Sequence, residues 1–365
     1  MSGIRTDFGR WGGNVPLFDL YYAWEAEKTA LIEAHGEQAL VEAGVDTKAD
    51  FAHFLWGFVS TSFYAGYERV MSQWKRYVGT ESVNSFDEVR IKGINGLTGI
   101  GYVGDYGEYP GMRRTFRPEA AIVVDTYGGV YAMTRKLLRS AGADRLVQRN
   151  PNDIGEAMAD FITQMIVAMI VANPNAPDGV AMYHNSRGNQ QAAALSEGTF
   201  VDAAVWLRTQ RNDDGRPIRV NMRTAVVQND RQALILNRIT RSAQTGATVN
   251  DPTSQSFDKG TDNPIANANL LPADGVVIDP YFPDANDVYF FADPNRNPAF
   301  VAAFLDGQET PMIGMAESTV VHLSVSGGNG RDPYSYEGDT IDYKTRHDVG
   351  VSAIDPRGTY RLTPA

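Results

Sequence analysis

The chain has 365 residues, 43% of them hydrophobic and 21% charged, which is ordinary for a globular protein. It contains no cysteine, so disulfides, thiolate metal sites and cysteine nucleophiles are excluded. Its formal net charge is −11, whereas a protein that binds nucleic acid tightly normally has an excess of basic residues. The N-terminus lacks the apolar core of a signal peptide, and the longest apolar run, Met165 to Ala172, is shorter than the roughly 20 residues of a membrane span. We therefore expect a soluble protein of intracellular origin that does not bind a membrane.

The first 80 residues predict a helical segment. One helix is expected from Tyr22 to Ala43, ending at Gly44, and a second after Asp46-Thr47, with apolar positions at helical spacing up to Val59. These helices carry more large aromatic side chains than they can bury alone. We expect the surface to pack on a body domain or on another chain, and the alternative is an ordinary helical subdomain.

A glycine-rich stretch follows between two β-prone runs. Gly99, Gly101 and Gly104 have the spacing of the dinucleotide-binding fingerprint, which works only where a helix begins within the motif. Here the chain continues into DYGEYPG (105–111), which has no helical apolar spacing. The stretch therefore predicts a long hairpin rather than a nucleotide site. Two strands alone in water are marginally stable, so the hairpin is expected to lie on something else.

The clearest helix is predicted from Pro151 to Ala172, capped by Asn150 or Asn152 and stopped at Asn173-Pro174. Its apolar residues form one continuous stripe, and its length would be roughly 33 Å.

Helices and strands alternate in the rest of the chain. A long polar loop is expected over 241–266, of the kind that is usually functional or mobile. The expected elements are a helix over 200–211, a strand over 218–227, a helix over 229–239, strands over 274–282 and 287–294, a short helix over 297–305 and a β-rich C-terminal segment.

No catalytic or metal-binding motif occurs. The five histidines do not fall at a metal-ligand spacing. His184, beside Ser186 and Arg187, is interpreted as a loop histidine bonded to backbone. The segment 284–297 is interpreted as a turn rather than a calcium loop, and Asp355 and Arg357 as part of a turn that orders the last strand. We predict that the protein is not an enzyme and has no catalytic residue, cofactor or metal site.

The order of these elements, together with three local sequence segments, resembles that of the major capsid (major head) proteins of tailed bacteriophages, which have the Hong Kong 97-like fold. The resemblance covers roughly Ser82 to the C-terminus. It is carried most specifically by YHNSRGNQQAAALSEGTFVDAAVWLRTQRNDDGRPIRV (183–220), GVVIDPYFPDANDVYFFADPNRNPAFVAAFLDG (275–307) and TRHDVGVSAIDPRGTY (345–360).

The resemblance implies an α+β capsid fold with five parts. They are a helical N-terminal arm (1–84), an extended β-hairpin loop (85–135), a peripheral domain with a spine helix (136–182), a mixed α/β axial domain (183–306) and a return to the peripheral domain (307–365). The extended loop would lie over a neighbouring subunit. Its implied interface residues are Gly99, Gly101, Gly104, Tyr109, Pro110, Gly111, Arg113 and Arg114.

The implied function is a structural subunit that assembles as hexamers and pentamers into an icosahedral phage head around double-stranded DNA, in a virion assembled in the host cytoplasm. Its main partner is itself. Scaffold, portal and cement proteins are further candidate partners, and packaged DNA would make only weak, non-specific contact. The alternatives are an encapsulin-type nanocompartment shell protein and, more distantly, a nucleotide-dependent oxidoreductase that uses the Gly99 motif.

Overall fold

The computed structural model describes part of the chain: residues 59–69, 73–98, 100, 102–103, 107–134, 136, 143–212, 215–242, 244–245, 261–316, 321–323, 329–331 and 338–364. The chain divides into two compact units. Unit 1 comprises Met1–Val70, Tyr127–Asp160 and Thr310–His347, and unit 2 comprises Met71–Thr126, Phe161–Glu309 and Asp348–Ala365. The helix expected over 22–43 lies outside the described residues. So does most of the helix expected after Asp46-Thr47, although residues 59–69 are helical.

Unit 2 contains a mixed five-stranded sheet in the order β5-β16-β10-β6-β9. The strand β10 lies at its centre, where Phe290 is opposite Ala225 on one side and Tyr360 on the other. The bounds are β5 Gln190–Gln191, β16 Thr359–Leu362, β10 Val288–Ala292, β6 Met222–Val227 and β9 Val276–Ile278.

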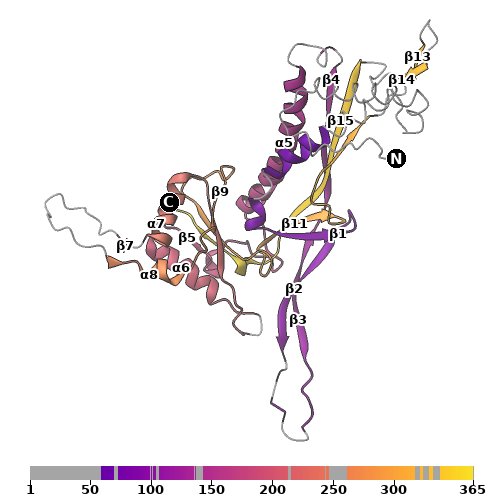
Figure 1. The fold of residues 1–365 in the computed structure, drawn as a ribbon. Coiled ribbons are helices and arrows are strands. Elements are labelled where there is room, and N and C mark those ends of the chain that lie inside the picture. The colour runs from indigo at the N-terminus through magenta and orange to yellow at the C-terminus, as the bar shows by residue number, and fades with distance from the viewer. Residues whose placement is uncertain are drawn as a thin grey trace, which may run out of the picture. The chain divides into compact units, whose positions relative to one another are not determined.

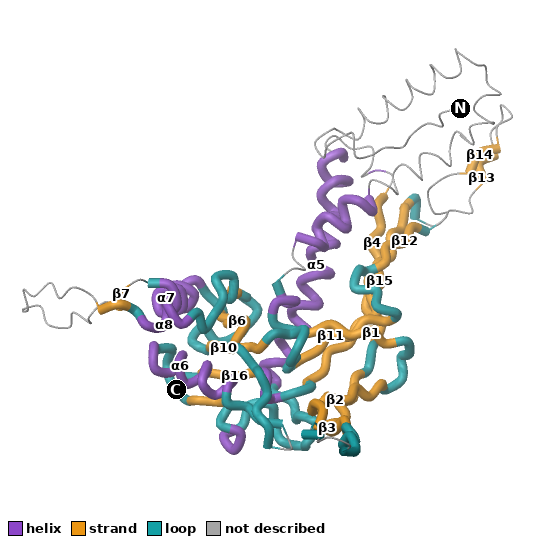
Figure 2. The backbone as a smooth tube through the Cα atoms, turned by 60° about the horizontal axis from the view of Figure 1, so that its bottom comes forward, coloured by secondary structure: helices purple, strands orange, loops and turns teal. Residues whose placement is uncertain are grey.

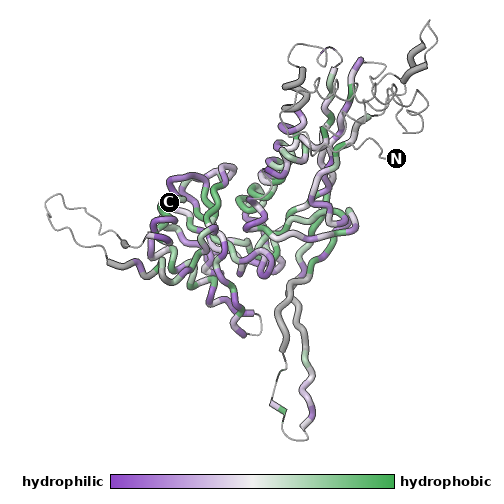
Figure 3. The backbone as a smooth tube through the Cα atoms, viewed as in Figure 1, coloured by the Kyte–Doolittle hydropathy of each residue, from purple (hydrophilic) through white to green (hydrophobic). Residues whose placement is uncertain are grey.

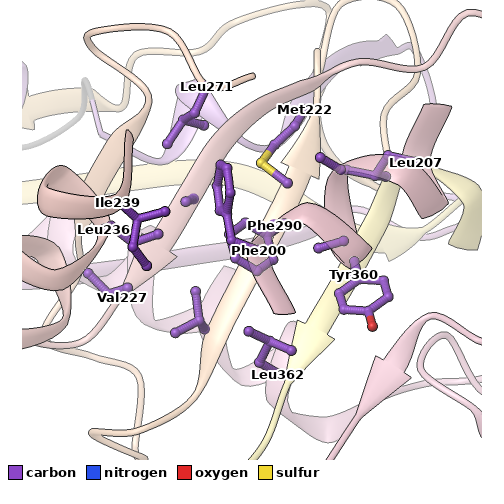
Figure 4. Packing of buried hydrophobic residues seen from close by; sticks show 14 of the residues in the cluster. Phe200, Leu207, Met222, Val227, Leu236, Ile239, Leu271, Phe290, Tyr360 and Leu362 are labelled. Carbon is purple, nitrogen blue, oxygen red and sulfur yellow. The ribbon is translucent and has the colours of Figure 1, made fainter. Parts of the chain in front are cut away.

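Two helices cover one face of this sheet: α6 (Glu197–Arg208) and α7 (Asp230–Arg241). Figure 2 shows both helices beside β6, β10 and β16. Their inward side chains join Phe290 and its neighbours in one buried cluster, seen at close range in Figure 4. Both helices begin at side-chain caps, Ser196 for α6 and Asn229 for α7. The helix expected over 229–239 is thereby confirmed, and the helix expected over 200–211 is found slightly earlier.

The opposite face of the sheet is covered by aromatic residues. Tyr77 stacks on Phe291 with ring centroids 5.3 Å apart, and its hydroxyl donates to Asp279 Oδ2 at 2.9 Å. Tyr183 and Tyr289 meet edge to face at 5.8 Å. Every one of these side chains is buried, so the sheet has packed residues on both faces.

A buried strand in unit 2 corrects one expectation. Residues 300–305 form β11 (Phe300–Leu305), not the short helix expected over 297–305. The strand pairs in parallel with β1 (Gly79–Val83) and antiparallel with the C-terminal part of β15 (Thr340–Ala353). A short, continuously apolar run does not distinguish a strand from a helix by periodicity. Here two flanking strands decide the conformation, and five of the six residues are buried.

In unit 1, the N-terminal part of β15 pairs with β12 (Met312–Met315), with Met312 opposite Arg346. The helical residues 59–69 pack against α5 (Ala143–Ala172) through two glycines. A Cβ added at Gly66 would lie 2.2 Å from the Asn152 carbonyl oxygen, and one added at Gly155 would lie 2.1 Å from that of Phe63. The two backbones therefore meet without side chains between them.

The helix α5 ends at Ala172, as expected, but begins at Ala143 rather than Pro151. The expected caps Asn150 and Asn152 therefore lie inside it, and that prediction is wrong. Proline removes one backbone hydrogen bond from a helix interior, and α5 continues through it. Hydrophobic and hydrophilic residues alternate along α5 in Figure 3. Its segment Asn150–Ala172 has the length and composition of a membrane span, but this is a weak indication because the core helix of a soluble protein passes the same test.

The remaining elements are short or border the segments above. The expected strands over 218–227, 274–282 and 287–294 are found as the shorter strands β6, β9 and β10, and the C-terminal segment is β-rich as expected. The expected polar loop contains the paired strands β7 and β8, and residues 246–260 lie outside the described part. The other bounds are η2 Trp74–Arg76, β4 Asp125–Thr134, η3 Asn185–Arg187, β7 Gln244–Thr245, β8 Thr261–Asp262, α8 Pro264–Ala268, β13 Val321–Leu323, β14 Asn329–Arg331 and η4 Pro356–Gly358.

Candidate functional site

The candidate site is the hairpin of unit 2 formed by β2 (Val89–Thr98) and β3 (Arg113–Ile122), which run side by side in Figure 1. The strands are antiparallel, from Val89 opposite Ile122 to Thr98 opposite Arg113. The register shifts around Ile94, which marks bulges within the pair. The expected hairpin is therefore present.

The base of the hairpin is anchored in a small core. Val89 and Ile91 pack against a cluster that includes Ile122, Val83 and Ala303. The Ser352 hydroxyl also donates to the Ala121 carbonyl at 2.7 Å. The base thus has the support that an isolated two-stranded hairpin lacks.

The tip of the hairpin, which we define as residues 99–112, exposes large apolar side chains. Ile100 is 79% exposed, Tyr102 95%, Tyr109 85% and Met112 64%. Four such side chains on one connection are unlike the scattered single exposures of an ordinary surface, and grouped exposed apolar side chains are typical of interaction sites. Tyrosine is suited to a contact surface because it combines a large apolar ring with a hydroxyl that can remain hydrogen-bonded.

The predicted interface residues fall on or beside this tip. Tyr109, Pro110 and Gly111 are exposed on it, and Arg113 and Arg114 begin β3. Gly99, Gly101 and Gly104 lie outside the described residues. Sequence reasoning did not single out Ile100, Tyr102 and Met112. The signal was available, since these are large apolar residues within a glycine-rich connection.

The residues that follow the glycine motif show whether it has the helix that a dinucleotide site needs. The fingerprint needs a helix whose N-terminal amides face a pyrophosphate. Within the described part of this region, residues 107–112 are irregular and 113–122 form β3, so no helix follows the motif there. The strand–glycine–helix arrangement of a dinucleotide site is thus not formed by those residues.

The side chains considered for chemistry have structural roles. His184 precedes η3, and its Nδ1 accepts from the Ser186 backbone amide at 3.2 Å, as expected for a loop histidine bonded to backbone. Asp355 accepts from the backbone amide of Arg357 at 2.9 Å and pairs with its guanidinium, which confirms the expected turn.

The segment 284–297 also contains the turns that were expected. Asp284 accepts from the Asn286 amide at 2.9 Å, and Asp293 from the Asn295 amide at 3.0 Å. Over the described residues, no group of three or more His, Asp or Glu side chains is arranged to hold a metal ion.

Comparison with known proteins gives one family match. A family described as phage capsid protein matches residues 118–362, more than half of the chain. The match begins within β3, so the hairpin tip precedes it. No curated protein matches the sequence.

Several solved structures are similar at low identity. A structure from Microbacterium phage Oxtober96 is 12% identical in sequence. The aligned region covers 79% of this chain and 90% of the phage chain, with a TM-score of 0.44. The capsid structure of cyanophage P-SCSP1u is 11% identical, with coverage of 80% and 88% and a TM-score of 0.47. The holo-SrpI encapsulin complex of Synechococcus elongatus PCC 7942 is 10% identical, with coverage of 80% and 88% and a TM-score of 0.42. Because these scores are low, the family of the chain rests on the family match alone.

Proposed function

The chain belongs to the phage capsid protein family, and we propose that it is the shell-forming subunit of a phage head. In this proposal, copies of the chain assemble as hexamers and pentamers into an icosahedral shell that encloses double-stranded DNA. The role is structural, in line with the family, and none of the proposed contacts requires a catalytic group.

The observation that carries the proposal is the exposed apolar tip of the hairpin. Tyr102 and Tyr109 are almost fully exposed, although an aromatic side chain buries about 150–250 Å² in a contact. In a shell built from one repeated chain, the surface that covers the tip belongs to another copy. The anchored base fixes where the hairpin leaves its own unit, and the tip is then available to the neighbouring subunit.

We extend the proposal to the structural role of each segment of the chain. Residues 1–84 form an arm, 85–135 the extended loop, 136–182 and 307–365 the peripheral domain, and 183–306 the axial domain. In this scheme the axial segment 183–306 would contribute β5, β10, β6 and β9 of the five-stranded sheet together with α6 and α7, and the segment 307–365 would contribute β16. Scaffold, portal and cement proteins would be partners of the assembled shell.

An encapsulin-type nanocompartment is the second candidate function. It would use the same copy-to-copy contacts and differ in its contents, which would be a cargo enzyme rather than DNA. The two are separated by extracting particles from the native source and measuring nuclease-protected DNA and co-purifying protein. Protected double-stranded DNA would support the phage head, and a stoichiometric cargo protein without DNA would support the nanocompartment.

The assembly proposal is tested with the tip variant Tyr102→Ser/Tyr109→Ser. We expect the purified wild-type chain to form closed shells, or rings of five and six, in negative-stain micrographs and sedimentation. The serine variant should remain as small, folded species, because two large aromatic contacts are removed from each interface.

Two controls accompany this test. Tyr102→Phe/Tyr109→Phe keeps the rings and should assemble, and Val205→Ser removes an exposed apolar residue of α6, 53% exposed, away from the tip. Circular dichroism establishes that each variant is folded. Normal shells from the serine variant would show that the tip is not the assembly contact. A wild-type chain that stays monomeric at every salt concentration would oppose the shell proposal itself.

A further inference from the structure

The outer face of α7 carries a row of arginines. The core-facing residues of the helix, Ala233, Leu236 and Ile239, are buried in the unit 2 cluster. The exposed positions on the opposite side are Arg231, Leu234, Arg238 and Arg241. Their spacing of three, four and three residues places them on one side of an α-helix. We call these four residues the α7 stripe.

The α7 stripe is basic within an acidic chain. Between Arg208 and Arg241 the sequence has eight arginines and three aspartates, whereas the whole chain has a net charge of −11. The stripe spans ten residue steps, or about 15 Å at 1.5 Å per residue. Over the described part of the chain, none of its three guanidinium groups belongs to an ion pair of the structure, in contrast to Arg223, which pairs with Asp274. The stripe therefore presents a concentrated positive charge outward.

An apolar residue lies in the middle of this charge. Leu234 is 69% exposed and has Arg231 on one side and Arg238 on the other. Contact with a phosphate does not stabilise a leucine side chain, but covering that side chain with another apolar side chain lowers the free energy of the complex. Arginine in turn matches the planar carboxylate through paired hydrogen bonds. The two features together fit a partner that alternates carboxylates with an apolar side chain.

We propose that the α7 stripe is a docking surface for an acidic polypeptide segment that places an apolar side chain on Leu234 and carboxylates on the flanking arginines. The partner is a second protein rather than nucleic acid, because a sugar–phosphate backbone would leave Leu234 uncovered. This proposal goes beyond shell assembly and does not depend on it, since the stripe is complete within one chain.

The proposal is tested by peptide binding to the full-length chain, followed by fluorescence anisotropy. The probe is a short labelled peptide of glutamates with one central leucine. A matched peptide has serine in place of the leucine, and a short duplex DNA carries comparable charge. Each probe is measured with the unassembled chain and with assembled particles, at low and at physiological salt.

We expect Arg231→Glu/Arg238→Glu/Arg241→Glu to weaken binding of the leucine peptide by about tenfold or more, since three favourable charge contacts become repulsive. Leu234→Ser should weaken the leucine peptide several-fold and leave the serine peptide unchanged. That second result is the signature of the apolar contact, which charge attraction alone would not produce.

The control variant Arg208→Glu/Arg216→Glu/Arg219→Glu changes the net charge by the same amount at exposed arginines outside the stripe. It should retain most of the binding. Equal loss in the control variant would overturn the proposal in favour of diffuse charge attraction. Duplex DNA that binds as tightly, with no effect of Leu234→Ser, would assign the stripe to nucleic acid instead.

Two further outcomes are decisive. Absence of any binding of the leucine peptide would overturn the proposal. If the stripe variant is folded yet no longer assembles, the occupant is a second copy of this chain, which also overturns it. Because assembly is scored separately by negative stain, failure of the shell proposal and failure of the docking proposal can be told apart.

Discussion

The buried tyrosines differ in whether their hydroxyls are hydrogen-bonded. The Tyr77 hydroxyl donates to Asp279 at 2.9 Å, and Tyr289 donates to Asp287 at 3.1 Å. The Tyr343 hydroxyl is buried and has no hydrogen-bond partner among the described residues. A buried polar group without a partner loses its hydration and gains nothing in return. The same chemical change, removal of a hydroxyl, should therefore have opposite effects at different tyrosines.

We predict that Tyr343→Phe raises the free energy of unfolding by about 1 kcal/mol and that Tyr77→Phe lowers it by about 1–2 kcal/mol. The first change removes an unsatisfied hydroxyl, and the second takes a donor from a buried carboxylate. Urea unfolding midpoints of the two variants and the wild type measure both effects. Destabilisation by Tyr343→Phe would show that its hydroxyl has a partner in solution.

Tyrosine ionisation also predicts how stability depends on pH. Burial is the main cause that raises the pKa of Tyr77, with Asp279 adding to it, and burial likewise raises the pKa of Tyr183 and Tyr289. Because the folded-state pKa lies above the unfolded value of about 10, the unfolded chain releases these protons first as pH rises. The stability contributed by the protonated hydroxyls is thus complete below about pH 10 and lost above it.

We therefore expect the urea midpoint to decline as the pH rises above about 10, and to continue declining toward the raised folded-state pKa values. Tyr183→Phe should make that decline shallower, because one titrating group is removed. The difference in tyrosinate absorbance between the wild type and Tyr183→Phe, in which the exposed tyrosines cancel, should rise together with unfolding rather than before it. A difference signal that appears while the chain remains folded would contradict the raised pKa of Tyr183.

At the scale of elements, the pairing of residues 59–69 with α5 depends on Gly66 and Gly155. A Cβ at Gly155 would lie 2.1 Å from the Phe63 carbonyl oxygen, far inside van der Waals contact. Gly155→Ala must therefore separate the two backbones. We predict that it destabilises unit 1 by about 2 kcal/mol or more, the usual cost of overpacking a close contact.

A second glycine in a helix serves as the control. A Cβ at Gly198 in α6 would meet only Ser196 Oγ at 3.9 Å. Gly198→Ala should stabilise the protein by up to about 1 kcal/mol, because alanine is the better helix former. Thermal unfolding of both variants gives the comparison. Equal stabilisation in the two would show that the helices do not approach as closely as described.

The sequence was informative about elements where local signals decide them. Asn229 predicted the start of α7, and Asn173-Pro174 predicted the end of α5. The start of α5 was missed because Pro151 favours a first turn, yet one lost hydrogen bond does not end a long helix. The strand β11 was missed because β1 and β15 determine its conformation, and neither is near it in sequence. The hairpin was predicted from its glycines, and Ile100, Tyr102 and Met112 were missed although they are large apolar residues within the same glycine-rich connection.

At the scale of the whole molecule, the family match and the mixture of helices and strands confirm the expected α+β, Hong Kong 97-like class. The five-part domain scheme stays a prediction. The net charge of −11 also belongs to this scale, because it acts between copies of the chain rather than at one site.

We predict that added salt promotes shell formation. Copies of like charge repel one another at a distance, and the Debye length falls from about 30 Å at 0.01 M to about 10 Å at 0.1 M salt. The apolar contacts proposed for the tip would be little affected by such screening. Light scattering of the purified chain across a sodium chloride series should show earlier and more extensive assembly at higher salt. Assembly that weakens with salt would indicate that attractive ion pairs between copies dominate.

The pairing of β1 with β11 has a consequence for the order of folding during synthesis. Gly79 lies opposite Val301, so β1 leaves the ribosome long before its partner is made. Until then, β1 and the base of the hairpin beside it lack the strand that completes their core. Contacts between such distant segments form slowly, and incomplete sheet edges are prone to aggregate. A nascent chain of this protein therefore has a long interval in which a chaperone, or a pause in translation, would determine its yield.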